Sequence, residues 1–188
     1  MRVISGSFKG KKIFEPKDNK TRPIKDLAKE SIFNIIEHSN KVNAQLIDSN
    51  ILDLFSGVGS FGIECLSRGS KKVVFVENYS GVLPILKKNL SSLKIDKNYE
   101  ILENDIYNDK ILSKLNNKFD IIFLDPPFKD KNLDRFLSKL KNFKILNKNG
   151  VIIIHRHKDD NDNFSQKYKI VDEKKYGISK IYFLTNLN

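Results

Sequence analysis

The sequence has one cysteine, fewer acidic than basic residues, and no apolar run approaching 18 residues. A lone Cys65 excludes an internal disulfide and fits a reducing cytoplasm. Its place in a helical pattern predicts a packing role. The missing apolar run excludes a transmembrane helix. Residues 1–10 hold glycines and charges where a signal peptide needs an apolar stretch. We therefore expect a cytoplasmic location.

The shortage of acidic residues leaves a net charge of +11, from 34 Lys and Arg against 23 Asp and Glu. The excess is uneven, because residues 1–25 hold eight basic and only two acidic residues. Such a cluster favours a polyanionic partner, although a solvated, lysine-rich face would look the same. The basic residues are Arg2, Lys9, Lys11, Lys12, Lys17, Lys20, Arg22 and Lys25.

At 188 residues the chain is long enough for one domain with a small appendage. Residues 2–4 and 11–14 flank a glycine-containing connection and predict a β-hairpin. A helix is expected from Thr21-Arg22-Pro23 to about residue 38. Strands and helices then alternate, which predicts an α/β fold with a mostly parallel sheet covered on both faces. The expected strands are 51–55, 72–77, 99–102, 119–124, 151–155, 168–171 and 181–184; the helices are 60–66, 80–93, 108–116 and 131–141.

Residues 53–62, D-L-F-S-G-V-G-S-F-G, place three glycines in a G-x-G-x-x-G pattern after the first expected strand. Gly57 permits a tight turn, Gly59 allows a ligand to approach the backbone, and Gly62 allows close helix packing. Glu77 lies 20 residues beyond Gly57, where a carboxylate can accept the ribose hydroxyls of an adenosine cofactor. To this point NAD and S-adenosylmethionine fit equally well.

Asp53 favours S-adenosylmethionine, because a carboxylate before the loop would repel a pyrophosphate but suits a cationic sulfonium and ammonium. The alternative is that Asp53 caps local backbone amides. Asp105, after the third strand, could accept from an adenine amine with Ile106 against the ring; alternatively it only forms a turn. The predicted cofactor-binding residues are Asp53, Phe55, Gly57, Gly59, Glu77, Asn78, Asp105 and Ile106.

Asp125-Pro126-Pro127-Phe128 follows the fourth expected strand, where ligands bind in open α/β sheets. The two prolines make the turn rigid. The Asp125 carboxylate and the Pro126 carbonyl can accept the protons of an exocyclic purine amine, and Phe128 offers a stacking face. Catalysis would rest on positioning and needs no nucleophile or metal. Alone, the tetrapeptide could be a stiff surface turn; with the other motifs it predicts catalytic Asp125, Pro126, Pro127 and Phe128.

These segments together resemble the bacterial guanine N2-methyltransferases that act on 16S ribosomal RNA. The resemblance rests on residues 53–69, V-F-V-E, F-L-D-P-P-F, the opening M-R-V-I-S-G-S-F-K-G-K-K-I, T-R-P-I-K-D-L-A-K-E-S-I-F-N and the late K-Y-G-I-S-K-I-Y-F-L. It spans nearly the whole chain. It implies a Rossmann-like methyltransferase fold, with a mostly parallel seven-stranded sheet and an antiparallel C-terminal strand at residues 21–188, behind a basic β-hairpin at 1–20.

The resemblance further implies methyl transfer from S-adenosylmethionine to a guanine N2 amine of 16S ribosomal RNA within a small-subunit particle, by a monomer. Phosphate contacts are expected from Arg2, Lys9, Lys11, Lys12 and Arg22. Ser5 and Ser56 stand where the family more often has Gly or Ala. His155-Arg156-His157 replaces a strand end that is commonly acidic, and as a metal site these two histidines lack further ligands.

Three other functions remain open at this stage. A D-P-P-aromatic turn also serves DNA adenine N6-methylation, although no separate target-recognition domain is visible. The glycine pattern alone would allow an NAD-dependent oxidoreductase. The basic charge would also suit a ribosome-assembly RNA-binding protein with an inactive site.

Overall fold

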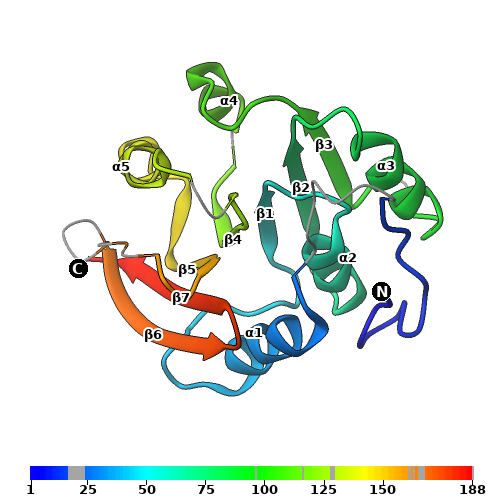
Figure 1. Cartoon of the computed structure of the whole chain (residues 1–188), viewed down its shortest axis with the longest axis horizontal. Coiled ribbons are helices and arrows are strands. Elements are labelled where there is room, and N and C mark those ends of the chain that lie inside the picture. The colour runs from blue at the N-terminus through cyan, green and yellow to red at the C-terminus, as the bar shows by residue number, and fades with distance from the viewer. Residues whose placement is uncertain are drawn as a thin grey trace.

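A seven-stranded sheet forms the centre of the computed structural model, which describes residues 1–16, 24–95, 97–115, 117–127, 130–160, 162, 164 and 168–187. The strand order is β3-β2-β1-β4-β5-β7-β6 (Figure 1). The first five strands are parallel, and β7 runs antiparallel to β5 and β6. This confirms the expected topology. The strands are β1 Asn50–Leu54, β2 Lys72–Glu77, β3 Tyr99–Glu103, β4 Phe119–Leu124, β5 Leu146–His157, β6 Tyr168–Tyr176 and β7 Ser179–Asn186.

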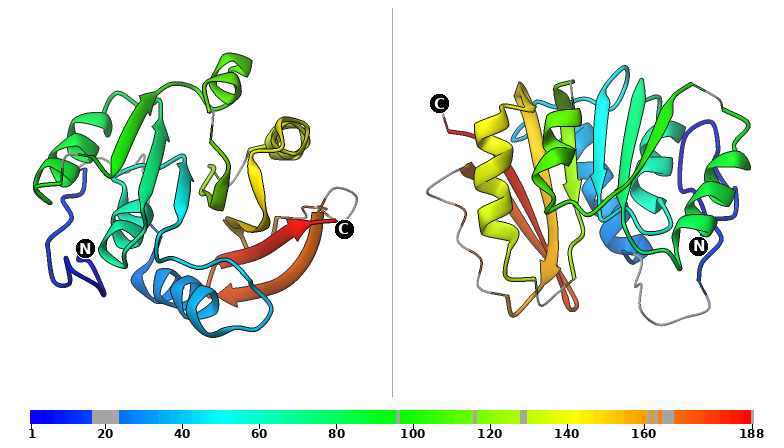
Figure 2. Two further views of the ribbon diagram at one scale, coloured as in Figure 1. Left: turned by 180° about the vertical axis from the view of Figure 1, so that it is seen from behind. Right: turned by 90° about the horizontal axis from the view of Figure 1, so that it is seen from above.

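Helices cover both faces of the sheet (Figure 2). Side chains alternate between the faces along each strand, so in β4 Phe123 joins one core and Leu124 the other. On one face Phe61 of α2 stacks on Phe123 at 4.0 Å between ring centroids, and Phe33 of α1 stacks on Phe61 at 5.2 Å. α1 Asp26–His38, α2 Ser60–Ser67 and α3 Leu83–Ser91 pack on this face; α4 Asp109–Lys114 and α5 Leu133–Phe143 pack on the other.

The parallel register brings the carboxyl ends of the central strands to one edge. Leu54 at the end of β1 pairs with Val76 of β2 and with Leu124 of β4. The loops that follow β1, β2 and β4 therefore meet. These are the loops that carry the glycine pattern, Glu77 and Asp125.

The N-terminal segment forms a shorter antiparallel pairing than the sequence predicts. Arg2 and Lys12 make an isolated antiparallel bridge, and the Val3 N–H donates to the Lys11 carbonyl at 3.0 Å. Val3 and Ile13 are buried in the α1–α2–α3 core, and Figure 2 shows the segment beside α2 and α3. The predicted domain boundary at residue 20 lies outside the described residues.

Most expected elements are present, with shifted ends. α1 begins at Asp26 within the described residues, and Thr21-Arg22-Pro23 lie outside them. α3 begins at Leu83 rather than residue 80, which leaves the proline at 84 in the first turn as expected. β5 begins at Leu146, five residues before the predicted start. The polar residues 147–149 conceal this start, and a register shift against β4 accompanies it.

Two further findings bear on the opening expectations. The Cys65 thiol is fully buried, and this burial raises its pKa well above the usual value, as expected of a packing residue. Across the part of the chain that the structure describes, each helix is too short or too polar to cross a lipid bilayer.

Candidate active site

The loop after β1 turns through left-handed backbone at Phe55, Gly57 and Gly59. Gly62 packs so closely on β2 that a Cβ there would lie 2.3 Å from the Phe75 ring, which agrees with its predicted packing role. A Cβ at Gly59 would lie 2.5 Å from Leu86, so Gly59 faces the protein. Open space lies instead beside Gly57.

Glu77 is joined directly to this loop. One carboxylate oxygen accepts from the Gly57 N–H at 2.7 Å, and the other accepts from Asn78 at 2.9 Å and Tyr79 at 2.8 Å. The carboxylate is thus fixed at the end of β2 beside the glycine turn. Asn78 itself is exposed.

Asp53 is buried in β1, with 1% of its surface exposed. One oxygen accepts from the Gly62 N–H in α2 at 3.0 Å, so the capping alternative is realised for that oxygen. Burial raises its pKa well above the ordinary value, and nearby Asp125 and Glu77 raise it further, against the opposing Gly62 hydrogen bond. Three carboxyl groups therefore concentrate negative potential at this edge of the sheet.

Asp125 begins the loop after β4, where its N–H donates to the Leu54 carbonyl at 3.3 Å. Its carboxylate, 20% exposed, lies 2.8 Å from Nδ1 of His155 in β5. Pro126 is buried and Pro127 is exposed. Phe128 lies outside the described residues, so its stacking role stays a prediction.

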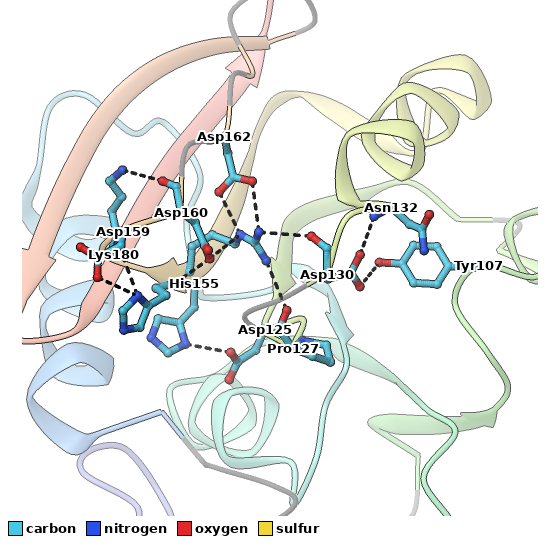
Figure 3. A network of polar contacts seen from close by, with 12 residues as sticks. Tyr107, Asp125, Pro127, Asp130, Asn132, His155, Asp159, Asp160, Asp162 and Lys180 are labelled. Atoms are coloured by element: carbon cyan, nitrogen blue, oxygen red, sulfur yellow. Dashed lines mark hydrogen bonds and ion pairs between the residues drawn. The ribbon is translucent and has the colours of Figure 1, made fainter.

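Arg156, which is 3% exposed, holds the backbone of the Asp125 loop. Figure 3 labels its partners Pro127, Asp130 and Asp162. Its guanidinium donates to the carbonyls of Pro127 at 3.4 Å and Asp130 at 3.3 Å. It also binds both carboxylate oxygens of Asp162 at 2.9 and 3.2 Å. One buried side chain thus joins the Asp125 loop to the segment after β5.

Asp105 and Ile106 follow β3. Asp105 is exposed and accepts from the Tyr107 N–H at 2.9 Å, which is the turn-forming alternative. Ile106 is buried in the core on the α4–α5 face, and Phe55 and Tyr107 pack against the same core with their ring centroids 5.9 Å apart. The Tyr107 hydroxyl donates to Asp130. A pocket of about 320 Å³ adjoins this cluster, lined by Tyr107, Asn132, Arg135, Phe136 and Lys139.

The four described cations of the predicted RNA-binding set are exposed on the N-terminal segment. Arg2 donates to the Gly10 carbonyl at 2.9 Å, and Lys11 to the Ser92 carbonyl at 2.9 Å. Lys12 lies 5.6 Å from the Phe14 ring centroid. Lys9 is exposed as well, and Arg22 lies outside the described residues.

His155, Arg156, Tyr107 and Asp130 were absent from the predicted site. From the sequence, residues 155–157 were interpreted only as a weak candidate metal site. His157 instead lies 3.5 Å from Asp159. In the described residues no three His, Cys, Asp or Glu side chains gather closely enough to hold a metal ion.

Comparison with known proteins identifies the family to which this chain belongs. Residues 1–185 match the model of the family described as conserved hypothetical protein 95. Ribosomal RNA small subunit methyltransferase D of Haemophilus influenzae is 33% identical over 179 residues, 95% of this chain and 90% of that protein. The enzyme of that name from Buchnera aphidicola of Baizongia pistaciae is 31% identical over 100% and 92% of the two chains.

Solved structures agree with the fold. The Escherichia coli protein yhhF superimposes with a TM-score of 0.80 at 25% identity, covering 99% of this chain and 97% of its own. The Haemophilus influenzae protein HI0767 gives a TM-score of 0.76 at 32% identity, over 100% and 99%. The sheet is thus the Rossmann-like methyltransferase fold that the resemblance implies.

Proposed function

The chain belongs to the conserved hypothetical protein 95 family and to that of the ribosomal RNA small subunit methyltransferases D, and on this premise we propose that it methylates ribosomal RNA. The methyl donor is S-adenosylmethionine. The acceptor is the exocyclic N2 amine of a guanine in 16S RNA, within a small-subunit particle. The protein acts as a cytoplasmic monomer.

One observation carries the choice of donor: Asp53, Glu77 and Asp125 share one edge of the sheet, at the carboxyl ends of the paired strands β1, β2 and β4. A pyrophosphate cofactor would add negative charge to this edge. A sulfonium and an ammonium group would instead neutralise it. Glu77 would accept the ribose hydroxyls, and Ile106 with Phe55 would contact the adenine. S-adenosylmethionine supplies an electrophilic methyl group when it is bound.

Asp125 and the Pro126 carbonyl would hold the two amine protons and turn the nitrogen lone pair toward the methyl group. N2 would then take the methyl group that bound S-adenosylmethionine supplies. The Asp125 carboxylate, or water, would accept the proton that the methylated nitrogen loses. Phe128 would stack on the base.

The substrate assignment is supported by the names of the relatives and by the exposed cations of the N-terminal segment. Lys12 and Lys88 are exposed and lie over the Phe14 ring, at 5.6 and 4.0 Å from its centroid. Exposed cations beside a half-buried aromatic ring suit a nucleic-acid backbone and an unstacked base. The same side chains would bind RNA in a particle as well as free RNA.

The test is product identity. Small subunits from cells that lack this protein are incubated with the pure protein and labelled S-adenosylmethionine; protein-free 16S RNA and duplex DNA serve as parallel substrates. Digestion and mass spectrometry should give N2-methylguanosine from the particle. N6-methyladenosine from DNA would replace this function with DNA methylation, and tight particle binding without methylation would indicate an assembly factor.

A further inference from the structure

Asp125, His155 and Ser179 form a continuous hydrogen-bonded chain across three neighbouring strands. His155 Nδ1 lies 2.8 Å from a carboxylate oxygen of Asp125, and its Nε2 lies 2.8 Å from the Ser179 hydroxyl. Asp125 follows β4, His155 is in β5, and Ser179 begins β7. The strand order β4-β5-β7 brings these three positions together.

This connectivity is that of a Ser-His-Asp triad, in which the histidine activates a serine nucleophile. Its exposure is the reverse of what a nucleophile needs. Ser179 and His155 are each 4% exposed, whereas the Asp125 carboxylate is 20% exposed. No substrate can reach the serine, so the accessible, working end of the chain is the aspartate.

The donors and acceptors limit which tautomer of a neutral His155 fits the chain. An ionised Asp125 can only accept, so Nδ1 of His155 carries a proton and donates it. In the neutral imidazole Nε2 then accepts, and the Ser179 hydroxyl donates to it. All three groups are satisfied by this one tautomer. One Asp125 oxygen is thereby committed to His155, which leaves the other oxygen for the base.

We propose that His155, held by Ser179, is the positioning residue that orients Asp125 toward the target amine. The proposal rests on the proposed function, since it needs Asp125 to bind the amine.

The experiment compares four variants of the full-length protein in the methylation of small subunits. His155→Phe keeps ring size without a donor, and His155→Asn places an amide N–H near the position of Nδ1. Ser179→Ala removes only the far hydrogen bond. His157→Phe makes the same change two residues along the strand and outside the chain.

We expect His155→Phe to lower kcat by about 10- to 100-fold, as second-layer partners of catalytic groups do, while the Kd for S-adenosylmethionine stays unchanged. His155→Asn should recover most of this loss, and Ser179→Ala should cost less than His155→Phe. His157→Phe should match the wild type. In an Asp125→Ala background, His155→Phe should have no further effect.

Unchanged kcat in His155→Phe and Ser179→Ala would overturn the proposal, and so would equal losses in His155→Phe and His155→Asn. Should His155→Phe fail to fold, Ser179→Ala and His155→Asn still decide the matter. Nitrogen NMR of the imidazole separates this proposal from the proposed function. It should show the Nδ1–H tautomer in the wild type and its loss in Asp125→Ala even if no methylguanosine is formed; a Nε2–H tautomer would contradict the chain.

Discussion

The Gly57 N–H donates a 2.7 Å hydrogen bond to the carboxylate of Glu77, 20 residues further along the chain. This bond joins the two segments that the sequence assigns to the cofactor, the glycine loop and the end of β2. The same carboxylate accepts from Asn78 and Tyr79. The glycine loop and the end of β2 are therefore joined within the protein itself, through the Glu77 carboxylate.

Glu77→Gln should weaken S-adenosylmethionine binding by about 10- to 100-fold, since an amide offers one acceptor oxygen in place of two and lacks the charge that strengthens these hydrogen bonds. Isothermal titration calorimetry measures the change. Glu100→Gln is the matched control, because Glu100 is exposed at the start of β3, where it pairs with Lys72 at 2.7 Å. Equal affinities for both variants and the wild type would remove Glu77 from the site.

Asp53→Asn should separate stability from binding. Burial raises the pKa of Asp53 in the folded protein above its ordinary value of 3.8, so ionisation favours the unfolded chain. The wild type therefore loses stability, relative to this variant, as the pH rises above about 4. The Asn oxygen can still accept from Gly62. We expect Asp53→Asn to gain a few degrees in Tm at pH 8 and nothing near pH 3.

The same variant should bind S-adenosylmethionine more weakly, because it carries no charge to face the cationic groups. Thermal unfolding from pH 3 to 8 and calorimetry at pH 8 measure the two effects. A Tm difference that shrinks with rising pH would show that the Asp53 charge stabilises the unbound protein.

Arg156→Lys should loosen the Asp125 loop, because an ammonium group cannot reach the two loop carbonyls and Asp162 at once. We expect kcat to fall by about tenfold or more, with cofactor affinity unchanged. Hydrogen exchange in the peptide covering residues 124–131 should accelerate. Arg135→Lys on the exposed surface of α5 is the control, and equal exchange in both variants would mean that Arg156 does not hold the loop.

The charge of the N-terminal segment should appear in the salt dependence of binding. Replacing Lys9 and Lys12 by Gln removes two phosphate contacts, so the slope of log K against log salt should fall by about 1.5. Lys174 and Lys175 of β6 lie on the opposite edge strand and supply the control pair. Filter binding to small subunits between about 50 and 300 mM salt measures the slope for each double variant. Equal slopes for the two double variants would place the RNA elsewhere.

The parallel core could be predicted because its strands are continuous apolar runs between strong turn signals, as at 119–124. The glycine loop and Glu77 were predictable because both have a fixed spacing along the chain.

The N-terminal pairing was predicted as a hairpin, but its attachment to the rest of the protein was not. Glu64 is fully buried in α2 and accepts from the N–H groups of Ile4 and Ser5 at 2.8 and 2.9 Å. A carboxylate in a helix usually indicates a solvent-exposed position, so nothing in the sequence indicated that Glu64 is buried.

The contacts of His155 and Arg156 with the Asp125 loop could not be assigned from local pattern, because those partners lie 26 to 30 residues away. The signal lay in the register: Leu124 pairs with Ile154 in parallel strands, so residues 125 and 155 must be neighbours. That deduction needs β4 and β5 to be adjacent, which only the strand order supplies. The resemblance marked residues 155–157 as a departure from the family pattern, but it did not indicate that Asp125 is the partner of His155.

The central claim is that Asp125 acts on the base and not on the cofactor. The most direct measurement compares Asp125→Ala with the wild type in calorimetric S-adenosylmethionine binding and in labelled methyl transfer to small subunits. The account predicts a Kd that is unchanged or only slightly weaker, since the lost negative charge makes no direct cofactor contact, together with loss of methyl transfer by about 1000-fold. A parallel loss of binding and transfer would contradict it.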